Sequence, residues 1–271
     1  MHQRPTISPY RHLLGAMVGA WPDVKDRLRW DLNALSRPSR QKLLAWRDRF
    51  GAADRAVVLC NGPSLNRVDF DAIAQAGAFT FGLNKINLLF ARSSFRPSCI
   101  VAVNGHVIEQ NAAFYDDTGI PLFLDSAAHT RVRHRDNVHF LHSSHQAKFA
   151  RDCSLSVSQG ATVTFVALQL AFHMGFRRVA LVGCDHSFAT KGPANATVTA
   201  GAVDHSHFDP NYFAGGVKWQ LPDLLTSEVS YTMAEQTFRE HGGEVVNATD
   251  GGRLEVFRRQ SLAEFLAART S

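Results

Sequence analysis

Several features that mark particular protein classes are missing from this 271-residue sequence. It has only four cysteines, and they lie far apart, without a CxxC or zinc-finger spacing: Cys60, Cys99, Cys153 and Cys184. This pattern predicts buried, reduced thiols in a cytoplasmic protein. No apolar run has the length of a membrane span, and the apolar piece at residues 13–21 is too short for a signal peptide and lacks its cleavage flank.

Long runs of one charge are also missing. The net charge is +5 and the isoelectric point about 9.2, but no block of five or six like charges occurs. This distribution gives no indication of a nucleic-acid-binding tail, so no nucleic acid is expected as a partner. The small basic excess fits ordinary solubility, an anionic substrate or a surface of anionic lipid.

Residues 10–50 have a helical pattern. Pro38 is expected to break the run, and Ser39 to cap the helix that follows. Lys25, Arg27 and Arg29 alternate with the apolar positions, so the segment is expected either to pack on the domain or to touch the inner face of a membrane peripherally. We expect residues 1–50 to form an N-terminal helical extension and residues 51–271 a catalytic domain. The apolar residues at helical spacing are Leu13, Leu14, Met17, Val18, Leu28, Trp30, Leu32 and Leu35.

Beyond residue 50, short apolar segments alternate with helical ones. This alternation predicts a Rossmann-like α/β fold, with a doubly wound, mainly parallel sheet. Residues 188–220 are polar and are expected to form a long loop. The expected strands are 56–60, 78–83, 99–103, 121–124, 138–141, 178–182 and 244–247. The expected helices are 70–76, 108–115, 162–174, 227–241 and 262–268.

Three expected strands end at an asparagine: Asn61, Asn84 and Asn104. In an open parallel sheet, ligands bind beyond the carboxyl ends of the strands. An asparagine side chain both donates and accepts hydrogen bonds, which suits ribose hydroxyls or a base edge. A single asparagine here is usually a turn residue, but three at matching positions favour a nucleotide site.

A small-residue segment, Ser158-Gln159-Gly160, leads into the apolar helix expected at 162–174. The N-terminus of such a helix offers free backbone N–H groups to an anion, although an ordinary N-cap is an equal alternative. The segment is not a Walker P-loop, because no Lys-Ser or Lys-Thr follows the glycine.

The densest polar cluster joins residues 185–187 (Asp-His-Ser) and 204–209 (Asp-His-Ser-His-Phe-Asp). One histidine could be a general base that a nearby aspartate orients. Alternatively, His205 and His207 could be metal ligands, or the histidines could be structural.

The ordered set of motifs resembles a known group of enzymes. Residues 61–65 (Asn-Gly-Pro-Ser-Leu) resemble the opening motif of bacterial family-42 sialyltransferases and of the wider MptE-like group, which includes archaeal pterin diphosphokinases and flagellin-glycosylation factors. Residues 158–160 resemble the Thr-Ser-Gly of that group, and 183–185 (Gly-Cys-Asp) its Gly-Ile-Asp. Residues 204–208 resemble the stretch that holds its catalytic histidine. The similarity covers about residues 56–247.

The resemblance implies a role for each motif. The nucleotide would be held by Asn61, Gly62, Pro63, Ser64, Asn84 and Asn104, and its phosphate would lie near Ser158, Gln159 and Gly160. His207 would be the catalytic base, with no metal ion. We also expect Asp185 and His186 to be catalytic. The chain departs from the sialyltransferase pattern at His186 and Ser187, which replace an aromatic residue and a leaving-group tyrosine. Candidates to stabilise the phosphate instead are Tyr212, His186 and Lys218.

These inferences lead to one expected function and two alternatives. We expect a metal-independent glycosyltransferase without a tightly bound cofactor, which uses a nucleotide sugar such as a CMP-sugar and acts on a cell-surface glycan or lipid-linked acceptor. Residues 208–228 would form a lid over the acceptor. The first alternative is an MptE-like diphosphokinase that uses ATP and Mg²⁺ held by Asp185, Asp204 or Asp209. The second is a nucleotide-binding module without chemistry.

Overall fold

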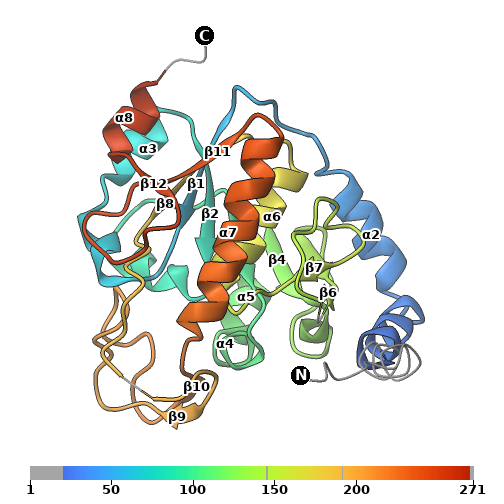
Figure 1. The fold of residues 1–271 in the computed structure, drawn as a ribbon. Coiled ribbons are helices and arrows are strands. Elements are labelled where there is room, and N and C mark those ends of the chain that lie inside the picture. Colours follow the sequence, from blue (N-terminus) through green and yellow to red (C-terminus); the bar gives the residue numbers. More distant parts are fainter. Residues whose placement is uncertain (1–20, 145, 191, 269–271) are drawn as a thin grey trace, which may run out of the picture.

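A sheet of eight strands, all paired in parallel, forms the centre of the molecule (Figure 1). The computed structural model describes residues 21–144, 146–190 and 192–268. The strand order is β12-β11-β8-β1-β2-β3-β4-β5, so the chain winds outward in both directions from β1. The strands are β1 (Arg55–Leu59), β2 (Phe79–Leu83), β3 (Cys99–Ala102), β4 (Leu122–Asp125), β5 (Val138–Leu141), β8 (Arg178–Val182), β11 (Glu244–Asn247) and β12 (Arg258–Arg259).

Helices cover both faces of this sheet. Alternate side chains of β1 divide between two cores: Ala56 and Val58 pack on one side, and Val57 and Leu59 on the other. The first side is covered by α2 (Ser36–Leu44), α6 (Val163–His173) and α7 (Leu224–Glu240). The other is covered by α3 (Phe70–Gln75), α4 (Gly105–Gln110), α5 (Ala112–Asp117) and α8 (Leu262–Ala267). The predicted Rossmann-like, doubly wound fold is therefore confirmed.

Some elements differ from the sequence-based prediction. The helix expected at 108–115 is two short helices, α4 and α5, which meet at Asn111; the Asn111 side chain there donates a hydrogen bond to Asn87. The expected loop 188–220 contains an antiparallel pair, β9 (Thr197–Thr199) and β10 (Lys218–Gln220). A small parallel pair, β6 (Ser143–Ser144) and β7 (Val157–Ser158), was also missed. Strands of two or three residues are too short to give a recognisable apolar period.

The expected break at Pro38 is wrong. Residues 21–31 are helical, the turn lies at 32–35, and Pro38 is inside the first turn of α2. A proline costs nothing there, because the N–H groups of a first turn have no partner within the helix. The expected apolar positions Leu13, Leu14, Met17 and Val18 lie outside the described residues.

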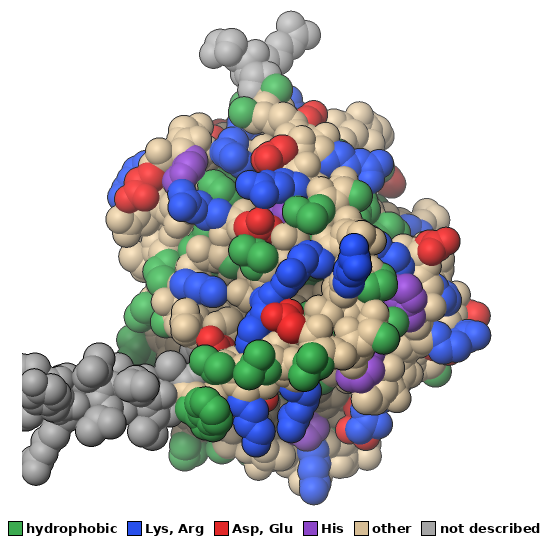
Figure 2. Space-filling model, turned by 90° about the vertical axis from the view of Figure 1, so that its right-hand side faces the viewer, with side chains coloured by type: hydrophobic (Ala, Val, Ile, Leu, Met, Phe, Trp, Pro, Cys, Tyr) green, Lys and Arg blue, Asp and Glu red, His purple; other side chains and the backbone are tan. Residues whose placement is uncertain are grey.

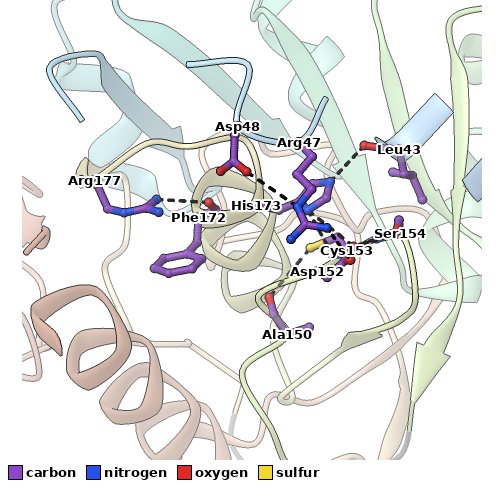
Figure 3. Close-up of polar contacts among 10 residues, drawn as sticks. All are labelled: Leu43, Arg47, Asp48, Ala150, Asp152, Cys153, Ser154, Phe172, His173 and Arg177. Atoms are coloured by element: carbon purple, nitrogen blue, oxygen red, sulfur yellow. Dashed lines mark hydrogen bonds and ion pairs between the residues drawn. The ribbon is translucent and has the colours of Figure 1, made fainter. Parts of the chain in front are cut away.

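Polar contacts fasten the end of α2 to the end of α6 (Figure 3). The buried His173 side chain donates from Nε2 to the Leu43 carbonyl oxygen at 2.9 Å. The backbone N–H of Asp48 in turn donates to the His173 carbonyl oxygen at 3.0 Å, and Arg47 pairs with Asp152. Because Leu43 also belongs to the core beneath α6, residues 36–50 are packed on the same core as the sheet.

The helix at residues 21–31 has one packed face and one exposed face. Trp30 is buried and meets Phe140 edge-on at 6.5 Å. Trp21, Val24 and Leu28 are exposed, followed by Leu32 in the turn after the helix. Figure 2 shows this side of the molecule, where hydrophobic side chains lie in a row next to Lys and Arg side chains. None of the described helices combines the length and the apolar character that crossing a bilayer would require.

Candidate functional site

A cavity of about 280 Å³ opens beyond the carboxyl ends of β1, β2, β3 and β8. Since β1 and β8 are the neighbours from which the chain winds in opposite directions, this is the topological switch point of the sheet. The predicted site residues that line it are Asn61, Gly62, Asn84, Asn104, Gln159, Asp185, His186 and His207. Pro63, Ser64, Ser158 and Gly160 lie next to these residues in the chain and are not part of the lining.

The turn after β1 is held against the turn after β8. The Gly62 N–H donates to the Gly183 carbonyl oxygen at 2.8 Å. Asp185 Oδ2 accepts hydrogen bonds from the Ser64 hydroxyl at 2.7 Å and the Ser64 N–H at 3.2 Å. Pro63 begins the short 3₁₀ helix η1 (Pro63–Arg67). In this structure Asp185 therefore positions the turn at residues 61–64, and its catalytic role stays a prediction.

Asn61 and Asn84 bring unpaired acceptors to the cavity. Both Oδ1 atoms are buried and have no partner at full hydrogen-bond distance and angle among the described residues. The buried Tyr212 hydroxyl lies near the Asn84 side chain; burial raises the pKa of this hydroxyl, and the contact with Asn84 opposes that shift. Asn84 also has a left-handed backbone, with φ of 47°. Leaving a buried acceptor unpaired costs about 1–3 kcal/mol, so these two oxygens favour a ligand that carries hydrogen-bond donors.

Asn104 has a different environment. Its Oδ1 accepts from the backbone N–H groups of His106 and Val107, which makes it the N-cap of α4. Its Nδ2 donates to Gln220 Oε1 at 3.2 Å and so links α4 to β10. The capping role explains why an asparagine stands at this strand end, and a contact with nucleotide stays a prediction.

The segment before α6 is built to present the start of that helix to the cavity. Gln169, inside α6, holds Ser158 by bonds to both its N–H and its carbonyl oxygen. Gln159 donates to Ser143 Oγ at 2.9 Å. Gly160 has a φ of 52°, and a Cβ there would lie 2.4 Å from the Phe165 ring. Thr162 caps α6, and the cavity lining includes residues 161–164 at its N-terminus.

His207 is paired with a buried carboxylate. Its Nδ1 donates to Asp204 Oδ2 at 2.8 Å, and the two side chains are 11% and 5% exposed. Burial favours the neutral form of Asp204. The hydrogen bond from His207 and those from the Ser206 and Phe213 N–H groups outweigh this effect, so the pKa of Asp204 lies below its ordinary value. With Nδ1 engaged in this way, the unprotonated nitrogen of the neutral ring is Nε2.

Aromatic rings hold the His207 imidazole in place. The ring stacks on Tyr212, with centroids 4.0 Å apart and planes 2° from parallel. It also meets Phe213 and Trp219 edge-on. Burial raises the pKa of Tyr212, whose side chain is almost inaccessible and underlies the histidine. Lys218 is exposed on β10 and outside the cavity lining.

Lys85 supports the site from outside the cavity lining, and it was not identified from the sequence. Its Nζ donates to Gln110 Oε1 at 2.6 Å and to the Tyr212 carbonyl oxygen at 2.7 Å, which anchors the His207 loop to the end of β2. Burial lowers the pKa of Lys85 to about 8, opposed by the charge of Asp204. Its position directly after Asn84, at a predicted strand end, was the signal that could have identified it.

The metal-ligand alternative and the state of the cysteines can also be compared with the structure. Among the described residues, no three His, Cys, Asp or Glu side chains come together as a metal site would require. His205, the proposed companion of His207, is exposed. All four cysteines are buried free thiols, as predicted, and Cys60 and Cys184 lie at the cavity wall.

Comparison with solved structures gives one informative similarity. The structure of the MAf glycosyltransferase from Magnetospirillum magneticum AMB-1 matches with a TM-score of 0.51 and 19% sequence identity. The match covers 97% of this chain and 43% of that protein, so this chain spans less than half the length of its structural neighbour. At this identity the similarity establishes a shared fold.

The sequence was also compared with curated proteins and with protein-family models. A search of curated proteins found no match. The family model described as "6-hydroxymethylpterin diphosphokinase MptE-like" matches residues 32–191, which include β1 to β8 and α6. Since this match covers more than half of the sequence, the chain belongs to the MptE-like family.

Proposed function

We propose that this protein is a glycosyltransferase that uses a nucleotide-activated sugar and a hydroxyl acceptor on a glycan or lipid-linked molecule. The observation that carries the proposal is the His207–Asp204 pair, in a cavity that is also lined by Asn61 and Asn84, whose buried side-chain oxygens are unpaired. A buried histidine oriented by a carboxylate is the arrangement that activates a hydroxyl for attack.

The proposed reaction follows from the free nitrogen of His207. Nε2 takes the proton of the acceptor hydroxyl while that oxygen forms a bond to the anomeric carbon of the sugar. The bond from that carbon to the donor phosphate breaks, and its electron pair remains on the phosphate oxygen. Asp204 stabilises the imidazolium that forms. General base catalysis of this kind contributes roughly 100- to 10,000-fold to the rate.

The nucleotide would lie along the ends of β1 and β2. Asn61 and Asn84 would accept hydrogen bonds from the base or the ribose, and the N-terminus of α6 would face the phosphate. A CMP-sugar is the first donor to test, because of the resemblance of residues 61–65 and 204–208 to the family-42 sialyltransferases.

A diphosphokinase is the second candidate, because the family's description names that activity. It would use ATP and Mg²⁺ bound by Asp185, Asp204 or Asp209. Among the described residues, however, these carboxylates do not come together with other His, Cys, Asp or Glu side chains in a group of three that could hold a metal ion. This favours the transferase. Turnover that strictly requires Mg²⁺, with tighter binding of ATP than of CMP, would favour the diphosphokinase.

The test combines nucleotide binding with turnover. CMP, CDP, UDP, GDP and ATP are screened by thermal shift with and without Mg²⁺, and nucleotide release is then measured from the matching sugar nucleotides. We expect His207→Ala to keep nucleotide affinity and to lose turnover, whereas His205→Ala, at an exposed histidine two positions away, keeps both. Wild-type turnover by His207→Ala would refute the proposed mechanism, and a wild-type protein that binds nucleotide without turnover would indicate a binding module.

A further inference from the structure

The cavity contains a second histidine with a carboxylate partner. Nε2 of His186, in the turn after β8, lies 2.9 Å from Oε1 of Glu228 on α7. The His186 side chain is 7% exposed and that of Glu228 47%. His186 is part of the cavity lining. This pair links the turn after β8 to α7, and it shares no residue with the His207–Asp204 pair.

The backbone of His186 is held in an unfavourable conformation. Its φ is 52°, in the left-handed region that few residues other than glycine adopt. The hydrogen bond from the Arg253 N–H to the Asp185 carbonyl oxygen holds the peptide group before it. Backbone strain of this kind is retained where the surrounding structure imposes it, commonly at functional sites.

His186 is connected to the start of α6 through Tyr231, which is on α7. The His186 ring is 6.2 Å from that of Tyr231, whose hydroxyl lies 3.3 Å from Oγ1 of Thr162, the N-cap of α6. By contrast, His207 is surrounded by the aromatic residues of the 204–219 segment. His186 is thus the histidine on the side of the cavity that receives the positive end of the helix dipole.

We propose that His186 binds the donor phosphate and that Glu228 positions its imidazole. This assignment rests on the proposed function. In its protonated form the ring donates from Nε2 to Glu228 and from Nδ1 to a phosphate oxygen. As the bond between sugar and phosphate breaks, the electron pair moves to the phosphate oxygen, which receives the Nδ1 proton. His207 separately takes the acceptor proton, so the protons and electrons of the transfer balance.

The test compares nucleotides with the nucleosides that lack their phosphate. CMP and cytidine, UMP and uridine, and AMP and adenosine are titrated into the full-length protein by calorimetry. The variant is His186→Asn, because asparagine tolerates a left-handed backbone and so preserves the turn. We expect the affinity for the bound nucleotide to fall roughly 10- to 100-fold and that for its nucleoside to stay unchanged, since a hydrogen bond between charged groups is lost.

Two variants of Glu228 on α7 test whether this residue positions the His186 ring or only stabilises the fold. Glu228→Gln should lower the affinity for the nucleotide, by less than His186→Asn does, and leave that for the nucleoside unchanged. Glu228→Asp, which keeps the carboxylate, should lower the nucleotide affinity less than Glu228→Gln. Glu235→Gln is the matched control, because Glu235 forms an ion pair with Arg239 on the same helix. It should leave both affinities unchanged. A melting curve for each variant establishes that it is folded.

The outcomes distinguish this assignment from the proposed function. Equal effects of His186→Asn on nucleotide and nucleoside, or no effect on either, overturn the phosphate role even if the wild type transfers sugar. A nucleotide-specific loss in a protein without sugar transfer supports the phosphate role and refutes the glycosyltransferase. If no nucleotide binds to the wild type, both are refuted.

Discussion

Gly62 and Asp185 lie so close that any side chain at position 62 would displace the Asp185 carboxylate or the Gly183 carbonyl group. A Cβ on Gly62 would be 2.0 Å from Asp185 Oδ2 and 2.7 Å from the Gly183 carbonyl oxygen. The carboxylate in turn holds the hydroxyl of Ser64. The turns after two neighbouring strands are thereby locked together beneath the cavity, and the position of Asn61 depends on this contact.

Gly62→Ala should destabilise the protein and weaken nucleotide binding. Forcing an extra carbon into a packed site costs about 1–3 kcal/mol, and the turn must move away from Asp185 to accept it. Urea unfolding and titration with CMP measure the two effects. Gly119→Ala is the control, since a Cβ there meets nothing within 4 Å. If the two variants have the same stability and the same affinity for CMP, the turn accepts a side chain at position 62 and the prediction is wrong.

Asp204→Asn should reduce turnover by roughly 100- to 10,000-fold while nucleotide affinity is kept. The amide can no longer stabilise a protonated His207, and it can donate to Nδ1, which places the ring proton on Nε2 and removes the base. Steady-state rates of nucleotide release measure the loss. Asp209 is in the same loop, and its side chain accepts a hydrogen bond from the Asn211 N–H. Asp209→Asn is therefore the control and should retain activity. A similar fall in both variants would point to loop disruption.

The sequence was informative wherever a pattern is local. Buried strands are apolar runs, and the carboxyl ends of parallel strands meet at one edge, so Asn61 and Asn84 could be expected to lie together. The fully buried α6 was predicted because its apolar residues surround the whole helix. A histidine oriented by a nearby aspartate could be expected in the 204–209 segment, because both residue types are dense there, but the sequence alone did not specify the pairing of His207 with Asp204.

Contacts between distant segments could not be predicted in this way. Glu228 is 42 residues from His186, and its pairing depends on how α7 crosses the sheet. Lys85 is buried against Tyr212 and Phe213, of which Tyr212 is 127 residues away in the sequence. Asn104 shows a second difficulty. An asparagine at a strand end can cap the next helix or contact a ligand, and the sequence does not distinguish these two roles.

The exposed apolar row at residues 21–32 predicts binding to anionic membranes. Trp21, Val24 and Leu28 are exposed at helical spacing, and Lys25 and Arg29 are exposed next to them in the sequence. Each basic residue near an anionic bilayer contributes about 1 kcal/mol. We expect co-sedimentation with phosphatidylglycerol vesicles, weaker with pure phosphatidylcholine and reduced by salt.

Substitution of Leu28 tests this surface. Leu28→Ser should weaken the sedimentation, and Leu225→Ser, at an exposed leucine on α7, should leave it unchanged. If Leu28→Ser instead dissociates an oligomer and vesicle binding is unaffected, the row contacts a second copy of the chain and the membrane prediction is wrong.

His139 should make the protein less stable in mild acid. Burial lowers its pKa from 6.5 to about 4, opposed by the hydrogen bond to the Leu122 carbonyl oxygen. Nδ1 donates to that oxygen, and Nε2 accepts from the Trp46 indole N–H at 2.9 Å. A proton on Nε2 would remove the acceptor for Trp46, so the folded state resists protonation.

The sign of the pH effect follows from this difference. As the pH falls below 6.5, the unfolded chain binds a proton at His139 before the folded chain does, which lowers the free energy of unfolding. The contribution is complete above pH 6.5 and is lost down to about pH 4; it amounts to about 3 kcal/mol. Urea unfolding at pH 7 and at intermediate acid values measures it. His139→Gln should remove this part of the slope, whereas His205→Gln, at an exposed position, should retain it. An unchanged slope in His139→Gln would show that other groups cause the acid sensitivity.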